Sequence, residues 1–533
     1  MGILTRLFKP GVACLIAVLG IGAHALEQPP AETPSFDIWE IQVEGNTLVD
    51  SRQIERAVYP HLGPDKTIDD VEQAREALES IFRTQGFGTV LVNIPEQDVN
   101  EGIVRLSVIE GRIERLHVTG SRYFSLGRIK AKVPSLRAGQ APELPRVQEE
   151  LSALNKATPD RVVTPVLRPG RTPGMVDVEL KVDDKLPVHG SVELNDQYTR
   201  DTSRTRLSAS LRYDNLWQKE HSLGLSYQVS PEDPDEVQVF SGTYLLRPEN
   251  SDLLFVLYGL RSNSDVLTGT STAGVGVLGK GWVGGVRVVK PLPSVADFNH
   301  NVTLGLDYKD FEDTVNPVGG AGFTTPLSYT KLVAGYSGFR LTDSATWRYN
   351  LEMNFGVRGL GNTEKEFESK RFQGKPNFLF LRHDFSVEQT LPFGSQLYAQ
   401  LAGQLASGAL VSNEQFSLGG DYSVRGYLDT QVLVDDAIRG RIEFRSPSFA
   451  AVLPLEFINV ARVVTFGEVA YGRVQEPLPG QGATTMLSSV GLGFRFEASY
   501  GFNSKIDWAY PLSNNGEIRS GESRLHFSFA QQF

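Results

Sequence analysis

Cysteine is nearly absent from the sequence, and the one that is present, Cys14, lies close to the start of the chain. A single cysteine cannot form an internal disulfide bond, so we expect a fold without covalent cross-links. Basic residues are outnumbered, with 52 Lys and Arg against 63 Asp and Glu. This balance argues against nucleic acid as a partner, because a nucleic-acid binder needs a basic face. After residue 25, no stretch reaches the roughly 18 uninterrupted apolar residues of a transmembrane helix.

The first 25 residues have the features of a signal peptide. Two basic residues precede an apolar run, Gly11–Gly22, that is too short to cross a bilayer, and Ala23-His24-Ala25 offers a small-x-small cleavage site. We expect residues 1–25 to direct export and to be removed, with an uncleaved anchor as the alternative. Residues 26–35 are a proline-rich linker. Ten residues make only about 15 Å of helix, so we expect no helix there that spans a pore.

Residues 36–184 predict two copies of one small α/β unit. Val43-Glu44-Gly45-Asn46 is echoed 75 residues later by Val118-Thr119-Gly120-Ser121. Both copies follow the order strand, helix, helix, strand, strand. In the first copy we expect strands at 36–43, 89–94 and 103–109 and helices at 50–62 and 68–85. In the second copy we expect helices at 125–132 and 144–156 and strands at 161–167 and 175–182. We therefore predict domains at 36–111 and 112–184, and we interpret Asp183-Asp184 as a solvated hinge.

The second helix of the first copy has clear start, face and stop signals. Thr67 and Asp70 have the spacing of a capping box, and Gly86 suits the C-terminal end. Between them, apolar residues recur at helical spacing and predict one buried face, formed by Val71, Ala74, Leu78, Ile81 and Phe82.

From about residue 188 the sequence alternates between apolar and polar residues, as Leu207, Leu211 and Tyr213 illustrate. Repeated alternation, with 52 Gly and 29 Phe overall, predicts a transmembrane β-barrel at 188–533, and its length accommodates about 16 antiparallel strands. A soluble sandwich would alternate too and is the alternative. The chain ends on an alternating strand with Phe529 and Phe533, an expected signal for the outer-membrane assembly machinery. An edge strand that happens to end in Phe is the other interpretation.

The most specific segment runs from Phe416 to Tyr427, with the sequence FSLGGDYSVRGY. Its glycines allow tight turns, and Arg425 offers a planar fork of donors for an acidic partner. Phe416 and Tyr427 can pack the segment against a wall. From these residues alone the segment can be a surface turn with a solvated arginine. The family resemblance described next implies instead a loop that folds into the barrel lumen.

These features resemble one known family. The α/β copies resemble POTRA (polypeptide-transport-associated) domains, and residues 93–99 with 108–111 resemble the first POTRA domain of two-partner secretion transporters of the ShlB/FhaC/HecB type. The segment 416–427 is similar to the F-S-L-G-G-x-x-x-V-R-G-[YF] stretch of these transporters. The resemblance implies α+β POTRA domains followed by an all-β barrel in the outer membrane, with the N-terminal domains in the periplasm.

The resemblance also implies a function and site residues. The POTRA domains would capture an unfolded exported client, expected to be large and β-helical, and the barrel would secrete it. An acidic wall partner is expected in an F-x-D-x-G motif, for which the nearest match is Phe466 with Glu468. The implied lumen-loop residues are Gly419, Gly420, Val424, Arg425, Gly426 and Tyr427.

Other functions remain as alternatives. A barrel-assembly factor for other outer-membrane proteins shares the POTRA units and the loop. A small-molecule porin or receptor is another alternative, and it would not need residues 36–184. The α/β modules themselves can also serve only to space or brace a barrel. Residues 274–279 satisfy G-x-G-x-x-G, but a strand rather than a helix is expected after them. No G-x-S-x-G or H-E-x-x-H motif occurs. We therefore expect no enzyme activity, no cofactor and no metal.

Overall fold

The computed structural model describes most of the chain after the linker: residues 34–99, 101–200, 202–249, 251–263, 268–269, 276–277, 279–315, 323–516 and 518–533. The predicted signal peptide and most of the predicted linker lie outside the described residues. Two compact units are distinguished, one formed by Met1–His117, Val133–Leu151 and Pro165–Leu180 and the other by Val118–Lys132, Ser152–Thr164 and Lys181–Phe533. None of the helices within the described ranges is both long and apolar enough to span a membrane.

The first α/β module contains more strands than the sequence predicts. Its elements are β1 (Phe36–Ile38), β2 (Glu40–Glu44), α1 (Ser51–Val58), β3 (Gly63–Lys66), α2 (Ile68–Thr84), β4 (Leu91–Asn93) and β5 (Ile103–Ile109). The main sheet has the order β2-β5-β4, while β1 pairs with β3. The single strand predicted at 36–43 is therefore wrong. Gly63-Pro64 does end the preceding helical segment, but it also begins β3, because residue 63 pairs with Ile38.

Helix α2 follows its sequence signals. The side chain of Thr67 accepts a hydrogen bond from the backbone of Asp70, and the Asp70 carboxylate accepts one from the backbone N–H of Thr67 at 2.9 Å, which completes the capping box. Val71, Ala74, Leu78 and Phe82 are buried as predicted, whereas Ile81 is partly buried. Gly86 follows the C-cap residue with φ +93°, a conformation that glycine adopts readily.

The second module repeats this arrangement with β6 (Arg112–Thr119), α3 (Leu126–Ala131), α4 (Leu144–Lys156), β7 (Arg161–Pro169) and β8 (Met175–Asp184), and its sheet has the order β6-β8-β7. Each module contains the same tight turn. Gly45 (φ +85°) and Gly120 (φ +88°) press against strand carbonyls, since an added Cβ would lie 2.4 Å from the oxygen of Val108 and 2.3 Å from that of Val182. Alanine therefore cannot replace either glycine without displacing the backbone.

A carboxylate at the end of the last strand closes this turn in both modules. Glu110 accepts a hydrogen bond from the hydroxyl of Thr47 at 2.8 Å. Asp184 accepts one from the hydroxyl of Ser121 at 2.7 Å and others from two backbone N–H groups at 3.0 Å. The interpretation of Asp184 as a solvated hinge is therefore wrong, because its carboxylate satisfies the donors of the turn.

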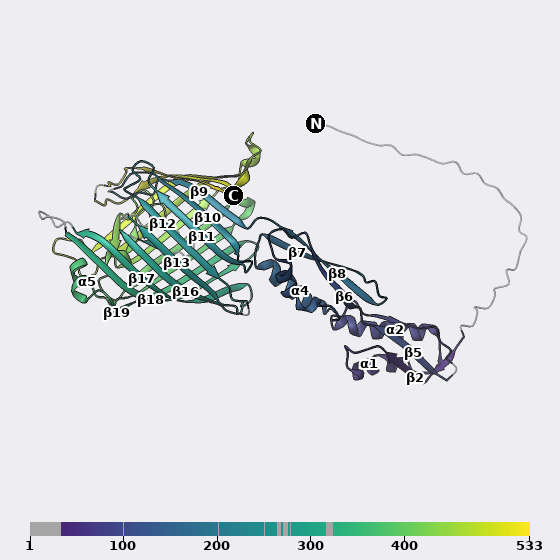
Figure 1. Cartoon of the computed structure of the whole chain (residues 1–533). Coiled ribbons are helices and arrows are strands. Elements are labelled where there is room, and N and C mark those ends of the chain that lie inside the picture. The colour runs from purple at the N-terminus through teal and green to yellow at the C-terminus, as the bar shows by residue number, and fades with distance from the viewer. Residues whose placement is uncertain are drawn as a thin grey trace, which may run out of the picture. The chain divides into compact units, whose positions relative to one another are not determined.

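The remaining chain forms a closed barrel of 16 strands, which confirms the predicted fold class and strand number (Figure 1). Wall strands that follow one another along the chain pair in antiparallel orientation. The wall strands are β9 (Val188–Asn195), β10 (Arg206–Leu216), β11 (His221–Val229), β12 (Gln238–Leu246), β13 (Leu254–Ser262), β16 (Gly281–Pro291), β17 (Phe298–Val315), β18 (Phe323–Leu341), β19 (Ala345–Gly361), β20 (Leu379–Thr390), β21 (Gln396–Ala406), β24 (Asp436–Arg445), β25 (Ile458–Arg473), β26 (Thr484–Ala498), β27 (Phe502–Pro511) and β28 (Arg524–Gln532).

The first and last wall strands close the barrel along a short seam. Residues Ser528–Gln532 of β28 pair with Ser191–Asn195 of β9, whereas β17 and β18 pair along the full length of β17. The G-x-G-x-x-G segment at 274–279 lies partly outside the described residues. The strand β16 begins two residues after it, so no helix follows the motif.

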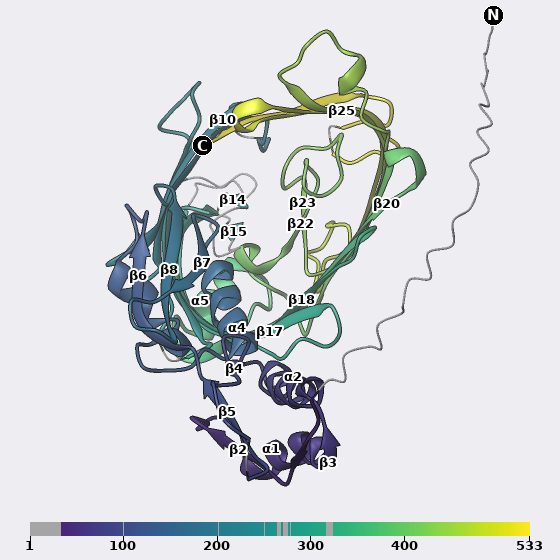
Figure 2. The same cartoon turned by 90° about the vertical axis from the view of Figure 1, so that its right-hand side faces the viewer.

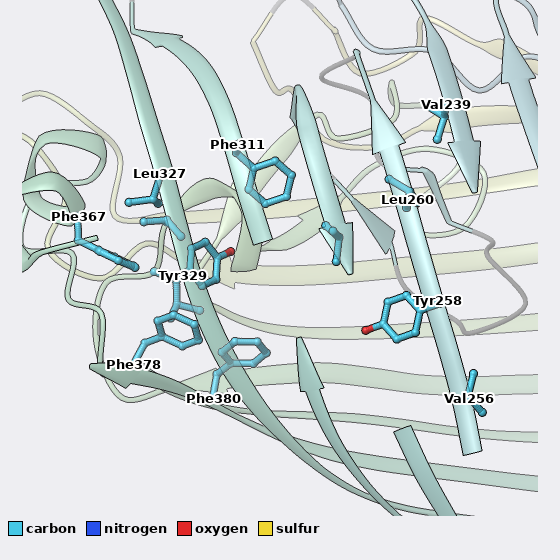
Figure 3. Close-up of a cluster of buried hydrophobic side chains, with 13 residues drawn as sticks. Val239, Val256, Tyr258, Leu260, Phe311, Leu327, Tyr329, Phe367, Phe378 and Phe380 are labelled. Carbon is cyan, nitrogen blue, oxygen red and sulfur yellow. The ribbon is translucent and has the colours of Figure 1, made fainter. Parts of the chain in front are cut away.

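Inside the barrel, a cluster of buried apolar side chains lines one part of the wall (Figure 3). We call it the wall cluster. It draws on β12, β13, β16, β17, β18 and β20, on the short helix α5 (Glu364–Lys370) and on residues just before β22 (Phe416–Leu418). Its members include Tyr258, Phe311, Tyr329, Phe367, Phe378, Phe380, Leu410 and Val411. An apolar filling of this kind is unusual for a lumen, which in wide barrels is polar and wet.

Candidate functional site

The chain between β21 and β24 leaves the wall and enters the barrel. We call residues 407–435 the inward loop. It contains a small hairpin of β22 (Phe416–Leu418) and β23 (Val432–Val434), which pair antiparallel from Phe416 with Val434 to Leu418 with Val432. Figure 2 shows this hairpin within the ring of wall strands. The segment that the sequence predicts as a lumen loop is thus placed inside the barrel.

The turn after β22 depends on its glycines. Gly419, Gly420 and Gly426 all have positive φ values. At Gly420 an added Cβ would lie 1.5 Å from a carboxylate oxygen of Asp429, so no other residue fits without rebuilding the loop. These glycines bring the tip of the loop, with Arg425, against the wall.

Arg425 is completely buried and contacts carboxylates from three wall strands. Its Nη2 lies 2.6 Å from Oε1 of Glu468 on β25 and 2.6 Å from Oε1 of Glu443 on β24. Its Nη1 lies 2.8 Å from Oδ2 of Asp507 on β27. The guanidinium also covers the ring of Phe466, 3.4 Å from its centroid. The backbone N–H of Arg425 donates to Oε2 of Glu468 at 2.6 Å.

This surrounding charge keeps Arg425 ionised. Burial by itself would lower the pKa of Arg425, but the carboxylates outweigh burial, with Glu468 first, and raise the pKa above its ordinary value. Three carboxylates facing one arginine would leave excess negative charge. Arg441 at 2.6 Å from Glu468 and Arg495 at 2.6 Å from Asp507 supply the balancing cations.

The residues that flank Arg425 are also held by the wall. The backbone N–H of Gly426 donates to Nε2 of His526 on β28 at 2.9 Å. Tyr427 is fully buried, and its hydroxyl donates to the carbonyl oxygen of Ser513 at 2.8 Å. Val424 and Tyr427 belong to a buried apolar cluster with Leu418, Ala470 and Leu487. Sequence reasoning did not identify the wall contacts of His526 or Ser513.

Two aspartates of the inward loop, Asp421 and Asp429, have pKa values shifted in opposite directions. Asp421 pairs with Lys505, which outweighs the effect of burial and holds the pKa of Asp421 below its usual range. For Asp429, burial first and the nearby charge of Asp421 second raise the pKa to about 7. The loop therefore carries one carboxyl group that titrates close to neutral pH.

Sequence reasoning identified part of this site. The structure brings Arg425 together with both residues of the proposed wall motif, Phe466 and Glu468. It adds Glu443 and Asp507, which the sequence did not single out because many acidic residues face the lumen at alternating positions. Which acidic residues surround Arg425 depends on how the loop crosses the lumen, and no local sequence pattern predicts that path.

The two terminal aromatic residues lie away from the inward loop. Phe529 lies on β28 opposite Ser504 of β27 and Leu194 of β9. Phe533 follows the end of β28, and its backbone exchanges two hydrogen bonds with Gly190, at 2.9 and 3.0 Å. Their role as an assembly signal remains a prediction.

One group of ligand-type side chains occurs within the described ranges: Asp160, His189 and Asp214. Nε2 of His189 lies 2.9 Å from Asp160, and Arg212 lies 2.9 Å from Asp214. Lys185 adds a second cation, 3.4 Å from Asp160. The carboxylates are therefore already neutralised by protein cations, and we assign no metal to them.

Comparison with known proteins places this geometry in context. The family model of haemolysin secretion/activation protein ShlB/FhaC/HecB matches residues 174–496, and the model of the ShlB-type POTRA domain matches residues 36–111. The outer membrane transporter CdiB of Dickeya dadantii (strain 3937) is 24% identical over 429 residues, which are 74% of this chain and 69% of that protein. The match to CdiB of Escherichia coli spans 184 residues, 34% of this chain and 31% of that protein.

Solved structures show the same fold. CdiB from Escherichia coli superposes with a TM-score of 0.59 at 17% identity, covering 96% of this chain and 93% of that one. BamA from Haemophilus ducreyi lacking POTRA domains 1–3 superposes with a TM-score of 0.56 at 14% identity, covering 93% of this chain and all of that one. Because the ShlB/FhaC/HecB model matches more than half of the residues, the chain belongs to the haemolysin secretion/activation protein family, whose members are outer-membrane transporters of two-partner secretion.

Proposed function

We propose that the chain captures an unfolded exported protein in the periplasm and passes it through its barrel to the outside. The observation that carries this proposal is the inward loop, which the buried Arg425 fixes to the wall inside a closed barrel. A simple diffusion pore has no need of a loop held by three carboxylates. A route that must open for a polypeptide and then close again does.

The two α/β modules supply the capture surface in this proposal, and we take residues 36–111 and 112–184 as two POTRA-type domains. Each has a three-stranded sheet with two edge strands, β2 and β4 in the first and β6 and β7 in the second. An edge strand offers unpaired backbone N–H and C=O groups, which an extended client can pair with as an added strand. Such pairing uses the backbone of the client rather than its side chains. It therefore suits an unfolded chain, whose backbone groups are exposed.

We further propose a dedicated client that is large and β-helical. No nucleotide is needed in this scheme, because folding of the client outside the cell prevents its return and gives the transport a direction. The proposal assigns the chain no catalytic step and no cofactor. Its own insertion is proposed to use the barrel-assembly machinery, with Phe529 and Phe533 as the signal.

A second candidate function is the assembly of other barrels into the outer membrane. The observation that favours it is the likeness in fold to BamA across 93% of this chain. At 14% identity this likeness concerns the fold, whereas the family match concerns the secretion transporters. We therefore rank assembly below secretion.

The test compares exported and outer-membrane proteins of cells with and without the gene by quantitative mass spectrometry. Loss of one or two large proteins from the medium or cell surface, with other barrels unchanged, is the result expected for a dedicated transporter. A joint fall of many barrels would instead indicate assembly. If neither population changes, a small-molecule porin becomes the better explanation.

A further inference from the structure

The inward loop has a second buried charged contact, at its stem rather than its tip. Glu414 lies eleven residues before Arg425 and is completely buried. Its Oε1 accepts hydrogen bonds from Nζ of Lys309 at 2.6 Å and from the hydroxyl of Tyr329 at 2.7 Å. Its Oε2 accepts one from Nζ of Lys331 at 3.1 Å. The side chain of Glu414 is thus held by β17 and β18.

The backbone around Glu414 is held by the same part of the wall. Its carbonyl oxygen accepts a hydrogen bond from Nη2 of Arg382 on β20 at 2.9 Å. Leu410 and Val411, just before it, are buried in the wall cluster beside Tyr329. Figure 3 shows Tyr329 among the aromatic side chains of this cluster. The stem of the inward loop is therefore held by apolar packing against the wall cluster as well as by ion pairs and hydrogen bonds.

The stem and the tip are fixed to different parts of the barrel. The side chain of Glu414 contacts β17 and β18, and its carbonyl oxygen contacts β20 and β21, whereas Arg425 contacts β24, β25 and β27. In the strand order of the wall, β19, β20 and β21 lie between β18 and β24. The chain joins the loop to the wall at β21 and β24, so a contact at the tip alone would leave the segment before the tip free to move. The Glu414 contact fixes that segment as well.

The charge balance at the stem makes Glu414 hard to replace. Asp307, the nearest other carboxylate, is 4.0 Å from Lys331 and is already paired with Arg287. The pKa of Glu414 lies well below its usual range, because Lys309 and Lys331 outweigh the effect of burial. Without the Glu414 charge, two buried ammonium groups would face each other with no adequate partner, an expensive arrangement.

We propose that Glu414 is a positioning residue that locks the stem of the inward loop to β17 and β18, so that the pore stays closed only while this contact and the Arg425 contact are both made. The inference deepens the proposed function, because it names the contact that must be released before a polypeptide can pass. It does not depend on the client, since closure is a property of the barrel alone.

The experiment measures ion conductance of the full chain in planar lipid bilayers, without any client. Glu414→Gln keeps the shape of the side chain but removes its charge. We expect the time-averaged conductance to rise on the order of tenfold or more, because one partner of a buried ionic cluster is lost. The matched control is Glu497→Gln, which removes the same charge from β26, a wall strand that carries neither Glu414 nor its partners on β17 and β18. Its conductance is expected to stay unchanged.

A second variant keeps the test valid if Glu414→Gln does not fold, which heat-dependent gel mobility would reveal. Lys309→Met with Lys331→Met removes the partners instead and is expected to raise conductance to a similar degree. Combining all three substitutions should add little, because the groups act as one unit. A folded Glu414→Gln barrel that conducts like the unmodified chain, or effects that multiply when combined, would overturn the proposal. Neither result bears on export, which the mass-spectrometry comparison tests separately.

Discussion

At the scale of single residues, the site is organised around one guanidinium group. Arg425 presents donors in several fixed directions, and the structure uses them for Glu468, Glu443 and Asp507 together. A lysine has one compact charge on a flexible stem and cannot satisfy three carboxylates on three strands. The need for arginine is therefore geometric as well as electrostatic.

Arg425→Lys and Arg425→Ala are both expected to lower client export at least tenfold while the barrel still inserts. Breaking a buried ionic cluster by removing one partner costs about 3–5 kcal/mol, which is enough to release the loop tip. Export then falls because the proposed route needs a loop that docks again after each opening, which the released loop cannot do. Export is measured by immunoblotting of the client in the medium, and insertion by heat-dependent gel mobility. Normal export by a folded Arg425→Ala protein would contradict the assigned role of the loop.

Asp429 is expected to make the stability of the docked loop depend on pH. The carboxyl of Asp429 loses its proton near pH 3.8 in an unfolded chain, but the folded protein keeps the proton until its raised pKa of about 7. Between these values the folded state binds more protons, so a rise in pH through this window lowers the stability of the docked loop.

We expect the thermal unfolding midpoint in detergent to fall between about pH 4 and about pH 7, and Asp429→Asn to reduce this fall, since its amide stays neutral throughout. The charged groups near Asp429 are Asp421, Asp196, His526 and Arg206, and all four are unchanged in the variant. An identical pH dependence in both proteins would show that Asp429 is not the responsible group.

At the scale of elements, the two α/β modules keep the same turn geometry although the residues of the turn differ. The two turns share only Val and Gly of four residues, yet both place a left-handed glycine against a strand carbonyl and close on a carboxylate, Glu110 or Asp184. The glycine is needed for space and the carboxylate for satisfying donors. We infer that the turn is what sets the position of the first strand of each sheet.

Gly45→Ala is expected to destabilise the first module more than Gly139→Ala destabilises the second. Both glycines have φ +85°, but an added Cβ at Gly139 meets nothing within 4 Å. The left-handed conformation costs about 1–2 kcal/mol at either position, and the clash with the Val108 carbonyl adds about 1–3 kcal/mol at Gly45 alone. Hydrogen exchange in the full chain measures the difference, in the β5 amides for Gly45→Ala and in the β6 amides, which lie beside Gly139, for Gly139→Ala. An equal loss of protection in the two variants would refute it.

The same scale shows what the sequence could and could not predict. Period-two alternation predicted the wall strands because each strand has one apolar and one polar face, as at Leu207 and Leu211. The capping signals of Thr67 predicted α2 because they act within four residues. The strand β3 was missed because it forms only by pairing with β1, 25 residues or more away. Local patterns predict local structure.

The candidate site follows the same division. Arg425 was identifiable from its glycine-rich surroundings, and Glu468 from a motif on a later strand. Glu443, Asp507 and Glu414 carry no such signal, because each is one acidic residue among 63. Their importance arises from where a loop of about thirty residues crosses the lumen, which depends on the closed barrel.

At the scale of the whole molecule, the chain combines edge-bearing α/β modules with a barrel whose interior is obstructed. Deleting residues 36–184 is expected to leave a barrel that inserts and yet exports no client, because capture is lost while the 16-strand wall is intact. Client secretion and barrel mobility on gels are the two measurements. If the shortened protein retains its function, the porin interpretation is favoured and the modules are dispensable.

The seam between β9 and β28 has a consequence for biogenesis. The hydrogen bond between Ser528 and Glu193 joins residues 335 positions apart, so the wall cannot close until almost the last residue has arrived. Contacts this distant in sequence form slowly, and the waiting chain exposes unpaired edges throughout. We therefore expect the whole chain to stay unfolded and prone to aggregation until the barrel closes. During its own export the protein thus meets the same requirement as the unfolded client that we propose for it.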